Sequence, residues 1–361
     1  MLKFKIGVEF IVKFKPMNIF FLCICLPLVL VSCNSRSKEP VSRETFLMGT
    51  IIKIQAYGKN ADKAVQASVD KISDIENKMS TNIPTSEVSK INKNAGVAPV
   101  KVSKNTLDVV KASLIYSKKT KGSFDITVEP LVALWGIGTD KARIPSKDEI
   151  DKSLKLINYK DIIINEKEST IMLKRKGQAM DLGAIAKGYT ADELKKIFIN
   201  YNVDSAFLSL GGNVYVIGNK PTKFPWQNKT PWNIGVQNPI HPTGNYLGTI
   251  SVSDKSIVTS GNYERFFEKN GKRYHHIFDT KTGYPAEKGL ISVSIISDKS
   301  IDGDALSTSV YTLGLDNGKK LIESLNNVEA IFVTNDKKVY ITSGLKDKFQ
   351  LTNTDFKLQD K

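Results

Sequence analysis

The sequence contains few cysteines, with three among its 361 residues. Cys23 and Cys25 lie in an apolar leader that we expect to be removed, so Cys33 would be the one thiol left and an internal disulfide is excluded. Collagen-like, heptad and low-complexity segments are also missing, which excludes a fibrous protein. About 330 residues then remain, enough for one large domain or two modest ones with a substantial core.

The start of the chain has no apolar run long enough to span a bilayer comfortably. Four lysines precede the apolar residues 19–31, and this order is typical of a signal peptide. The run ends in Leu30-Val31-Ser32-Cys33, which resembles a bacterial lipoprotein cleavage box. The alternatives are an ordinary secretory peptide and an uncleaved anchor.

The lipoprotein interpretation predicts how the N-terminal region is organised. Residues 1–32 would be a signal peptide, Cys33 would carry a lipid such as palmitate, and residues 33–42 would form a polar tether. We therefore expect a protein held to a membrane through its N-terminal lipid. It would lie in the bacterial cell envelope outside the cytoplasm, on the periplasmic face if the organism is Gram-negative.

Clustered basic residues are lacking, although the chain is strongly basic. The formal net charge is +15, and removal of the leader, with its four lysines and one glutamate, leaves about +12. The lysines are spread along the chain with acidic residues between them, whereas a nucleic-acid surface would gather them on one face. We expect no nucleic-acid partner. The diffuse charge favours anionic lipid headgroups and a phosphate-bearing ligand.

The hydrophobic periodicity predicts an α+β fold with largely antiparallel sheets flanked by helices. A period near 3.6 predicts helices at residues 61–79, 103–119, 184–200, 304–313 and 317–325. Alternating and β-branched runs predict strands at residues 50–57, 161–165, 170–174, 206–210, 213–217, 233–236, 248–252, 256–260, 272–279, 290–296, 328–334 and 338–342. Many of these strands are joined by short turns, which favours antiparallel pairing.

The segment Asp302-Gly-Asp-Ala-Leu-Ser-Thr308 has the spacing of a metal site. Asp304 and Thr308 are four residues apart and would lie on one face of a helix, with Asp302 near its start. Oxygen ligands of this kind suit Mg²⁺ or Ca²⁺ better than zinc, and Mg²⁺ often shares its coordination with substrate phosphates. The alternative is structural, because Asp is a common N-cap and a helical Thr often bonds back to a carbonyl.

The segment from Asp181 to Tyr189 joins a predicted strand to a predicted helix. Its sequence, Asp-Leu-Gly-Ala-Ile-Ala-Lys-Gly-Tyr, places Gly183 at the turn and Lys187 one turn into the helix. Free backbone N–H groups and the positive end of the helix dipole at such a turn can bind a phosphate. A purely conformational role for the glycine is the alternative.

Two of the three histidines are adjacent, at positions 275 and 276. On a strand they would face opposite sides, so one would point inward. An inward histidine beside a metal-bound phosphate can act as a general base because its pKa is near neutral. A partly buried histidine bonded to the backbone, or a surface pair, is the alternative.

Small and amide residues at Ser260-Gly-Asn-Tyr263 and Ser209-Leu-Gly-Gly-Asn213 would let a ligand approach the backbone, although turns use the same residues.

Taken together, these segments resemble the ApbE family, the bacterial FAD:protein FMN transferases, which are often exported as lipoproteins. The resemblance covers nearly the whole mature chain in seven ordered blocks. They are Met48-Gly-Thr50; Met79-Ser-Thr81 with Ser86-Glu87 and Ile91-Asn92; Ser123-Phe-Asp125 with Thr127-Val128 and Pro130; Asp181 to Tyr189; Gly211-Gly-Asn213; His276-Ile277 with Asp279 and Thr282-Gly283; and Asp304-Ala305 with Thr308. The resemblance implies an ApbE-like (T-fold-like) domain over residues 43–350 and a C-terminal tail at residues 351–361.

The resemblance also implies roles for individual residues. The ligands of Mg²⁺ would be Asp304, Thr308 and the backbone carbonyl of Ala184, with Asp302 as the helix cap or a neighbour of the ligands. The catalytic base would be His276. The FAD site would be lined by Met48, Ser123, Phe124, Asp125, Asp181 and Lys187 and bordered by Asn82.

The activity that the resemblance implies is Mg²⁺-dependent transfer of FMN from FAD, the substrate, to a Thr or Ser hydroxyl of an exported flavoprotein subunit, with release of AMP. Asn82 departs from the family pattern, because many members carry an aromatic residue there that packs near the flavin, and an Asn cannot stack. Asn82 leaves FAD hydrolysis open beside transfer, and a non-catalytic role is a separate alternative. The first would be the activity of a Mg²⁺-dependent FAD pyrophosphatase giving FMN and AMP, and the second that of a non-catalytic lipoprotein that binds flavin.

Overall fold

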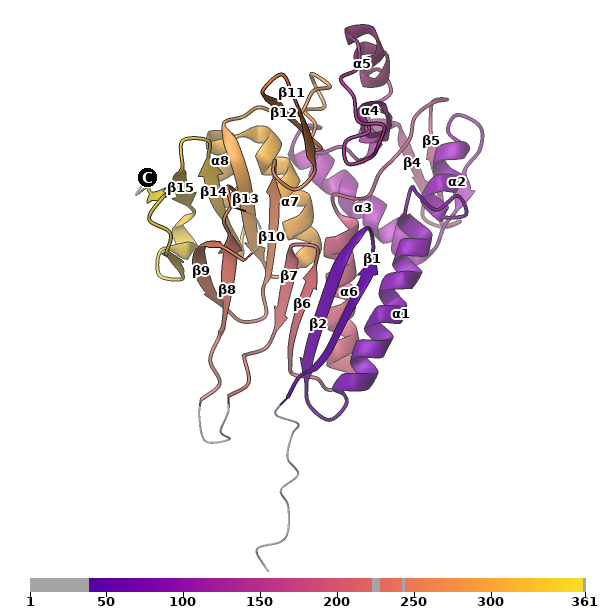
Figure 1. Cartoon of the computed structure of the whole chain (residues 1–361). Helices are drawn as coiled ribbons and strands as arrows, with labels where there is room; N and C mark the ends of the chain where they lie inside the picture. Colours follow the sequence, from indigo (N-terminus) through magenta and orange to yellow (C-terminus); the bar gives the residue numbers. More distant parts are fainter. Residues whose placement is uncertain (1–38, 223–227, 242–243, 360–361) are drawn as a thin grey trace, which may run out of the picture. The chain divides into compact units, whose positions relative to one another are not determined.

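The central element of the fold is a nine-stranded sheet, seen in the computed structural model of Figure 1. The structure describes residues 39–222, 228–241 and 244–359, which belong to one compact unit. The expected signal peptide and the predicted lipidation site Cys33 lie outside these residues. No helix within the described ranges is long and apolar enough to cross a membrane.

The strands of the central sheet follow the order β1-β2-β6-β7-β10-β13-β14-β15-β17. Neighbours pair antiparallel, except β15 and β17, which are parallel. In β2, Ile52 and Ile54 are buried while Ile51 and Lys53 are exposed, so one face of the sheet meets the core. The bounds are β1 Val41–Leu47, β2 Thr50–Tyr57, β6 Ser205–Leu210, β7 Asn213–Ile217, β10 Ser256–Gly261, β13 Leu290–Ser297, β14 Val328–Thr334, β15 Lys338–Ile341 and β17 Lys357–Leu358.

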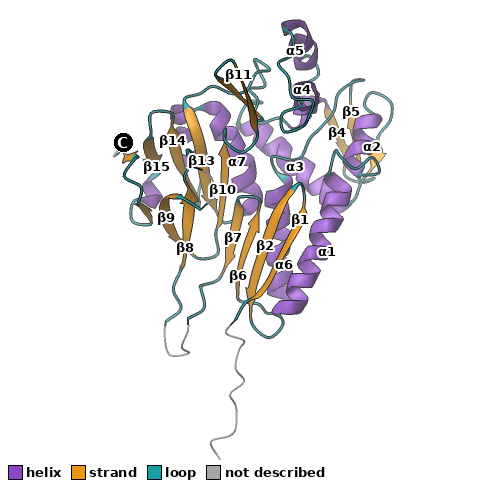
Figure 2. Cartoon of the chain, in the orientation of Figure 1, coloured by secondary structure: helices purple, strands orange, loops and turns teal. Residues whose placement is uncertain are grey.

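Helices cover one face of this sheet, as Figure 2 shows. They include α1 Ala61–Met79, α3 Lys104–Lys119, α6 Ala186–Asn200, α7 Ser300–Leu313 and α8 Leu315–Glu323. Apolar residues at helical spacing on α1, such as Ala64, Val65 and Ile72, pack with Leu194 and Phe198 of α6 against β2 and β6. α7 lies next to α6 and crosses β10 and β13. This packing holds α6 and α7 side by side.

The other face of the sheet is covered in part by a small sheet of order β16-β9-β8. Trp232 and Ile250 of this sheet share an apolar core with Ile257 and Ile296 of the central sheet. The bounds are β8 Trp232–Gln237, β9 Tyr246–Val252 and β16 Phe349–Leu351. The smaller elements are α2 Glu87–Lys93, α4 Glu129–Trp135, α5 Lys147–Leu154, a sheet of β3 Val100–Lys101, β5 Thr170–Leu173 and β4 Ile162–Asn165, and a hairpin of β11 Phe266–Lys269 and β12 Lys272–His275.

The predicted α+β architecture is confirmed, and the long elements lie where the periodicity predicts them. Helix α1 spans the predicted residues 61–79, while α7 begins at Ser300 rather than at Asp304. The prediction of a strand over residues 272–279 is wrong for residues 276–279, because β12 ends at His275. The chain turns there instead, with the Lys281 N–H donating to the Asp279 carboxylate at 2.9 Å.

The domain is longer at both ends than predicted. β1 begins at Val41, inside the stretch expected to be a tether. At the other end, β17 pairs with β15, and Phe356 is 3% exposed within the core shared by the two sheets. Burial of that aromatic side chain ties residues 351–358 of the expected C-terminal tail to the domain.

Candidate active site

Two tight hairpin turns form one wall of the site. The Met48-Gly49 turn joins β1 to β2, the Gly211-Gly212 turn joins β6 to β7, and all four residues have positive φ. Such turns twist in the same sense as the strands they connect. Because β2 and β6 are antiparallel neighbours, both turns lie at one end of the sheet. A Cβ at position 211 would lie 2.3 Å from Thr50 Oγ1, so this close approach requires glycine.

Two adjoining cavities lie at this end of the sheet. The larger, of about 790 Å³, is lined by both hairpin turns, the end of α1 and the loop that follows it. The smaller, of about 150 Å³, is lined by α7, β10 and the loops before α4 and after β12. The residues that line both cavities, which we call the junction, are Asp181, Gly183, Lys187, Gly211, Glu264 and Arg265.

The structure brings the predicted site residues together in these cavities, although they come from distant parts of the sequence. Met48 and Asn82 line the larger cavity. Asp181 and Lys187 lie in the junction. The smaller cavity is lined by Ser123, Phe124, Asp125, Ala184, His276, Asp304 and Thr308.

Polar groups of α6, α7 and β10 lie around Asp304. Its side chain is buried, and Oδ2 accepts a 2.8 Å hydrogen bond from the N–H of Gly188 on α6. Thr308 lies one turn further along α7, with its hydroxyl 3.4 Å from Oγ of Ser260. The Lys187 ammonium lies 4.0 Å from Asp304 Oδ1. Burial raises the pKa of Asp304, and the nearby Lys187 charge opposes that rise.

The donor atoms at this position suit a hard cation. The Asp304 carboxylate, the Thr308 hydroxyl and the Ala184 carbonyl all offer oxygen, which hard divalent cations prefer. Zinc sites usually add nitrogen or sulfur ligands. Within the described ranges, no group of three or more His, Cys, Asp and Glu side chains is placed to hold a metal. One carboxylate with neutral oxygens leaves coordination positions for phosphate oxygens, as Mg²⁺ prefers.

His276 lines the smaller cavity with a neutral imidazole ring. Its Nδ1 lies 3.2 Å from the Arg265 carbonyl oxygen, and because a carbonyl can only accept, Nδ1 carries the proton and Nε2 is the basic nitrogen. Burial, with help from the Arg265 guanidinium, lowers the pKa of His276 to about 3. The adjacent His275 belongs to the core, with Nε2 3.2 Å from the Ala286 carbonyl and its ring edge against Tyr311.

The sequence is similar to known proteins along most of its length. The sequence profile of the ApbE family matches residues 48–332. The chain belongs to the ApbE family. A Treponema pallidum protein named FAD:protein FMN transferase is 33% identical over 349 residues, 93% of this chain and 96% of that protein. A Klebsiella pneumoniae protein of the same name is 32% identical over 320 residues, 88% of this chain and 97% of that protein.

Solved ApbE structures share the fold. The ApbE protein of Thermotoga maritima is 32% identical, with a TM-score of 0.77, over 85% of this chain and 98% of that chain. Flavin transferase ApbE from Vibrio cholerae is 25% identical, with a TM-score of 0.75, over 86% of this chain and 99% of that chain. The predicted family and its ApbE-like α+β fold are therefore confirmed.

The prediction that Asp302 caps helix α7 is wrong. Helix α7 starts at Ser300, and the N–H groups of Ser300 and Ile301 donate to the carboxylate of Asp192 on α6 at 2.8 and 3.0 Å. That carboxylate caps the helix from a distant part of the sequence. Asp302 instead accepts a 2.6 Å hydrogen bond from the Tyr116 hydroxyl, and it lines neither cavity.

Asp125 lines the smaller cavity, but its carboxylate is occupied by hydrogen bonds within the protein. Oδ1 accepts hydrogen bonds from the N–H and hydroxyl of Thr127 at 2.8 and 2.7 Å, and Oδ2 accepts one from the Tyr159 N–H at 2.8 Å. These bonds hold the short turn Ile126–Val128 against the cavity. Asp125 therefore fixes the shape of the wall.

Two charged residues of the site are missed by the sequence predictions, Glu264 and Arg265. Both belong to the junction, directly after the Ser260 to Tyr263 segment that the sequence does single out. Burial raises the pKa of Glu264, and the charges of Lys187 and Arg265 oppose that rise. The available signal was a pair of opposite charges immediately after small and amide residues.

Gly188 allows α6 to approach α7 at the Asp304 position. A Cβ there would lie 2.3 Å from the Ser300 carbonyl oxygen and 2.7 Å from Asp304 Cβ. We therefore expect Gly188→Ala to push the helices apart and to lower the free energy of unfolding by about 1–3 kcal/mol. Urea denaturation measures this change. An unchanged denaturation midpoint would contradict the close packing.

Proposed function

We propose that this ApbE family member transfers FMN from FAD to a Thr or Ser hydroxyl of an exported redox flavoprotein, with Mg²⁺ as cofactor and AMP as the second product. The observation that carries the proposal is the smaller cavity, where a neutral His276 and the oxygens of Asp304 and Thr308 border one space. The relatives named FAD:protein FMN transferase support FAD as the donor.

The metal would be held by Asp304, Thr308 and the carbonyl of Ala184, all at the smaller cavity. Mg²⁺ bound there would neutralise negative charge on the FAD pyrophosphate. Lys187 adds a positive charge beside Asp304, and lysine is a common phosphate-binding residue. The chain therefore offers both an oxygen cluster and a fixed cation for a doubly charged pyrophosphate.

His276 is the general base in this proposal. Its Nε2 accepts the proton of the acceptor hydroxyl while the hydroxyl oxygen bonds to the FMN phosphorus. The bond from that phosphorus to the oxygen of the AMP phosphate breaks, and AMP leaves with the electron pair. The hydrogen bond from Nδ1 to the Arg265 carbonyl fixes the ring and stabilises the imidazolium that forms.

The proposed acceptor follows from the proposed location. A lipid on Cys33 and the residues after it would hold the domain close to a membrane, outside the cytoplasm. A redox subunit exported to the same membrane could then present its Thr or Ser to the cavities. The basic net charge supports attraction to anionic lipid headgroups.

A second candidate activity, hydrolysis of FAD to FMN and AMP, is favoured by Asn82. This exposed side chain lines the larger cavity and cannot stack on a flavin ring as an aromatic residue would. Chromatography of the products formed from FAD and Mg²⁺, with and without an acceptor protein, separates the candidates. Transfer gives AMP without free FMN, hydrolysis gives equal amounts of both, and a non-catalytic flavin binder gives neither.

The pH dependence of AMP release should reflect the lowered pKa of His276. A base with a pKa of about 3 stays neutral as the pH falls from 7.5 to 5.5, and it becomes protonated only as the pH approaches 3. We expect kcat/KM to change less than about twofold over that interval, whereas a histidine with its usual pKa would cause about a tenfold fall. A tenfold fall in a protein that keeps its circular dichroism spectrum would contradict this assignment.

A further inference from the structure

We propose that Arg265 is a further catalytic residue, whose guanidinium binds the FAD pyrophosphate and stabilises the charge that develops on the departing AMP phosphate. The inference rests on the proposed function and adds a residue to it.

The position of Arg265 is the first argument. It belongs to the junction, and a substrate that extends from one cavity into the other must pass there. The junction has two cations, Lys187 and Arg265, and two carboxylates, Asp181 and Glu264. FAD carries its two negative charges at the pyrophosphate in the middle of the molecule. An FAD molecule that occupies both cavities would therefore place its pyrophosphate beside Lys187 and Arg265.

The second argument is that the Arg265 side chain packs against the protein on one side while no ion pair with a described residue neutralises its charge. The aliphatic part of Arg265 lies along Gly138, where a Cβ would be 3.3 Å from Arg265 Cδ. Gly138 has a φ of +88°, a conformation that favours glycine, and its missing side chain leaves room for this contact. The charge of Arg265 acts on the neighbouring Glu264, but the guanidinium makes no ion pair with any described carboxylate. Its hydrogen-bond donors remain available for phosphate oxygens.

The third argument is the direct link between Arg265 and the base. The carbonyl oxygen of Arg265 accepts hydrogen bonds from both the N–H and Nδ1 of His276, each at 3.2 Å. One residue therefore fixes the orientation of the base and carries a cation toward the same space. The backbone position of Arg265 therefore determines both where its guanidinium lies and how the His276 ring is oriented.

The chemistry that follows assigns one task to each group. The acceptor oxygen bonds to the FMN phosphorus and its proton moves to His276 Nε2. The phosphorus–oxygen bond to AMP breaks, and the electron pair stays on the AMP phosphate oxygen, where the guanidinium can donate two parallel hydrogen bonds. Because negative charge on that oxygen grows as the bond breaks, Arg265 binds the transition state more strongly than the ground state.

The experiment compares Arg265→Ala with Arg273→Ala, which removes an exposed arginine of β12 that pairs with Glu268 outside both cavities. We expect Arg265→Ala to lower kcat for AMP release about 10²–10³-fold, with partial recovery when millimolar guanidine is added. Arg273→Ala should keep wild-type kcat and show no gain with guanidine. A structural role for Arg265 would not produce rescue.

Binding provides a second readout that does not need turnover. Arg265→Ala should weaken FAD binding while leaving the affinity for riboflavin, which lacks phosphate, within about twofold. Equal losses for both ligands, or wild-type kcat in Arg265→Ala, would overturn the proposal. If the wild-type protein releases no AMP, the proposed function fails, and the ratio of FAD to riboflavin affinity still decides whether Arg265 binds phosphate.

Discussion

An Asp304→Asn variant is expected to lose about 10³-fold or more of its AMP release, because several kcal/mol of metal-dependent charge stabilisation depends on this one carboxylate. Asp304 is the one charged group among the proposed metal ligands. Asparagine keeps the size of the side chain and one oxygen, and it removes the negative charge. Calorimetric titration with Mg²⁺ in the presence of FAD should show a matching loss of metal affinity.

The matched control for Asp304→Asn lies two residues earlier on the same helix. Asp302→Asn makes the identical chemical change, at a carboxylate that accepts a hydrogen bond from Tyr116 and lines neither cavity. We expect it to cost about 1 kcal/mol of stability and to keep wild-type turnover and Mg²⁺ affinity. If both variants lost activity equally, the effect would belong to α7 as a whole and the metal assignment would be contradicted.

A His276→Ala variant is expected to bind FAD and to lose protein flavinylation. Removal of a general base costs about 10²–10⁴-fold in rate, whereas the proposed metal ligands and Lys187 remain to hold the pyrophosphate. FAD affinity, measured by quenching of flavin fluorescence, should change by less than about tenfold. The loss should therefore be found in kcat.

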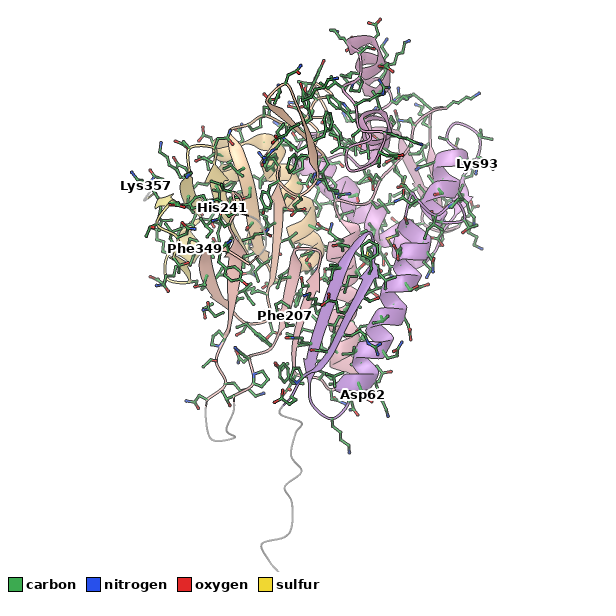
Figure 3. All side chains as sticks on the ribbon, viewed as in Figure 1. Asp62, Lys93, Phe207, His241, Phe349 and Lys357 are labelled. Atoms are coloured by element: carbon green, nitrogen blue, oxygen red, sulfur yellow. The ribbon has the colours of Figure 1, made fainter. Side chains whose placement is uncertain are left out.

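The control for His276→Ala is the third histidine. His241, labelled in Figure 3, is exposed and lines neither cavity. We expect His241→Ala to match the wild-type protein in rate and in FAD affinity. A His276→Ala protein that flavinylates its acceptor at the wild-type rate would remove His276 from the mechanism. If it failed to bind FAD at all, its role would be in binding and not in proton transfer.

The sequence predicted elements well where local patterns decide them. The long apolar stripe of α1 appears directly in the spacing of residues 61–79. The periodicity places the start of α7 at Asp304 instead of Ser300, because the residue that caps the helix, Asp192, lies 108 residues away from Ser300. Short elements such as the two-residue β17 have little periodicity of their own and depend on the sheet that they join. Tertiary contacts therefore explain most of the differences.

In the candidate site too, some residues have a local sequence signal and others are brought in only by tertiary contacts. The Met48-Gly49 and Gly211-Gly212 turns can be read locally, but only the pairing of β2 with β6 brings them together. The spacing of Asp304 and Thr308 predicted one helical face, and both residues line one cavity. The local signal for Arg265, opposite charges at positions 264 and 265 directly after small and amide residues, is weak because such charges are common after turns. The relation of Arg265 to the site appears only when the carbonyl contact with His276 is known.

The most direct test of the proposed transfer is the intact mass of an acceptor protein after incubation with this enzyme, FAD and Mg²⁺. We predict that the acceptor gains the mass of one FMN less one water, because the flavin phosphate is attached through a phosphoester, with one AMP released per modified molecule. The gain should disappear with Asp304→Asn and with His276→Ala and persist with Asp302→Asn. An unmodified acceptor in a reaction where FAD is consumed to FMN and AMP would contradict the transfer and establish hydrolysis in its place.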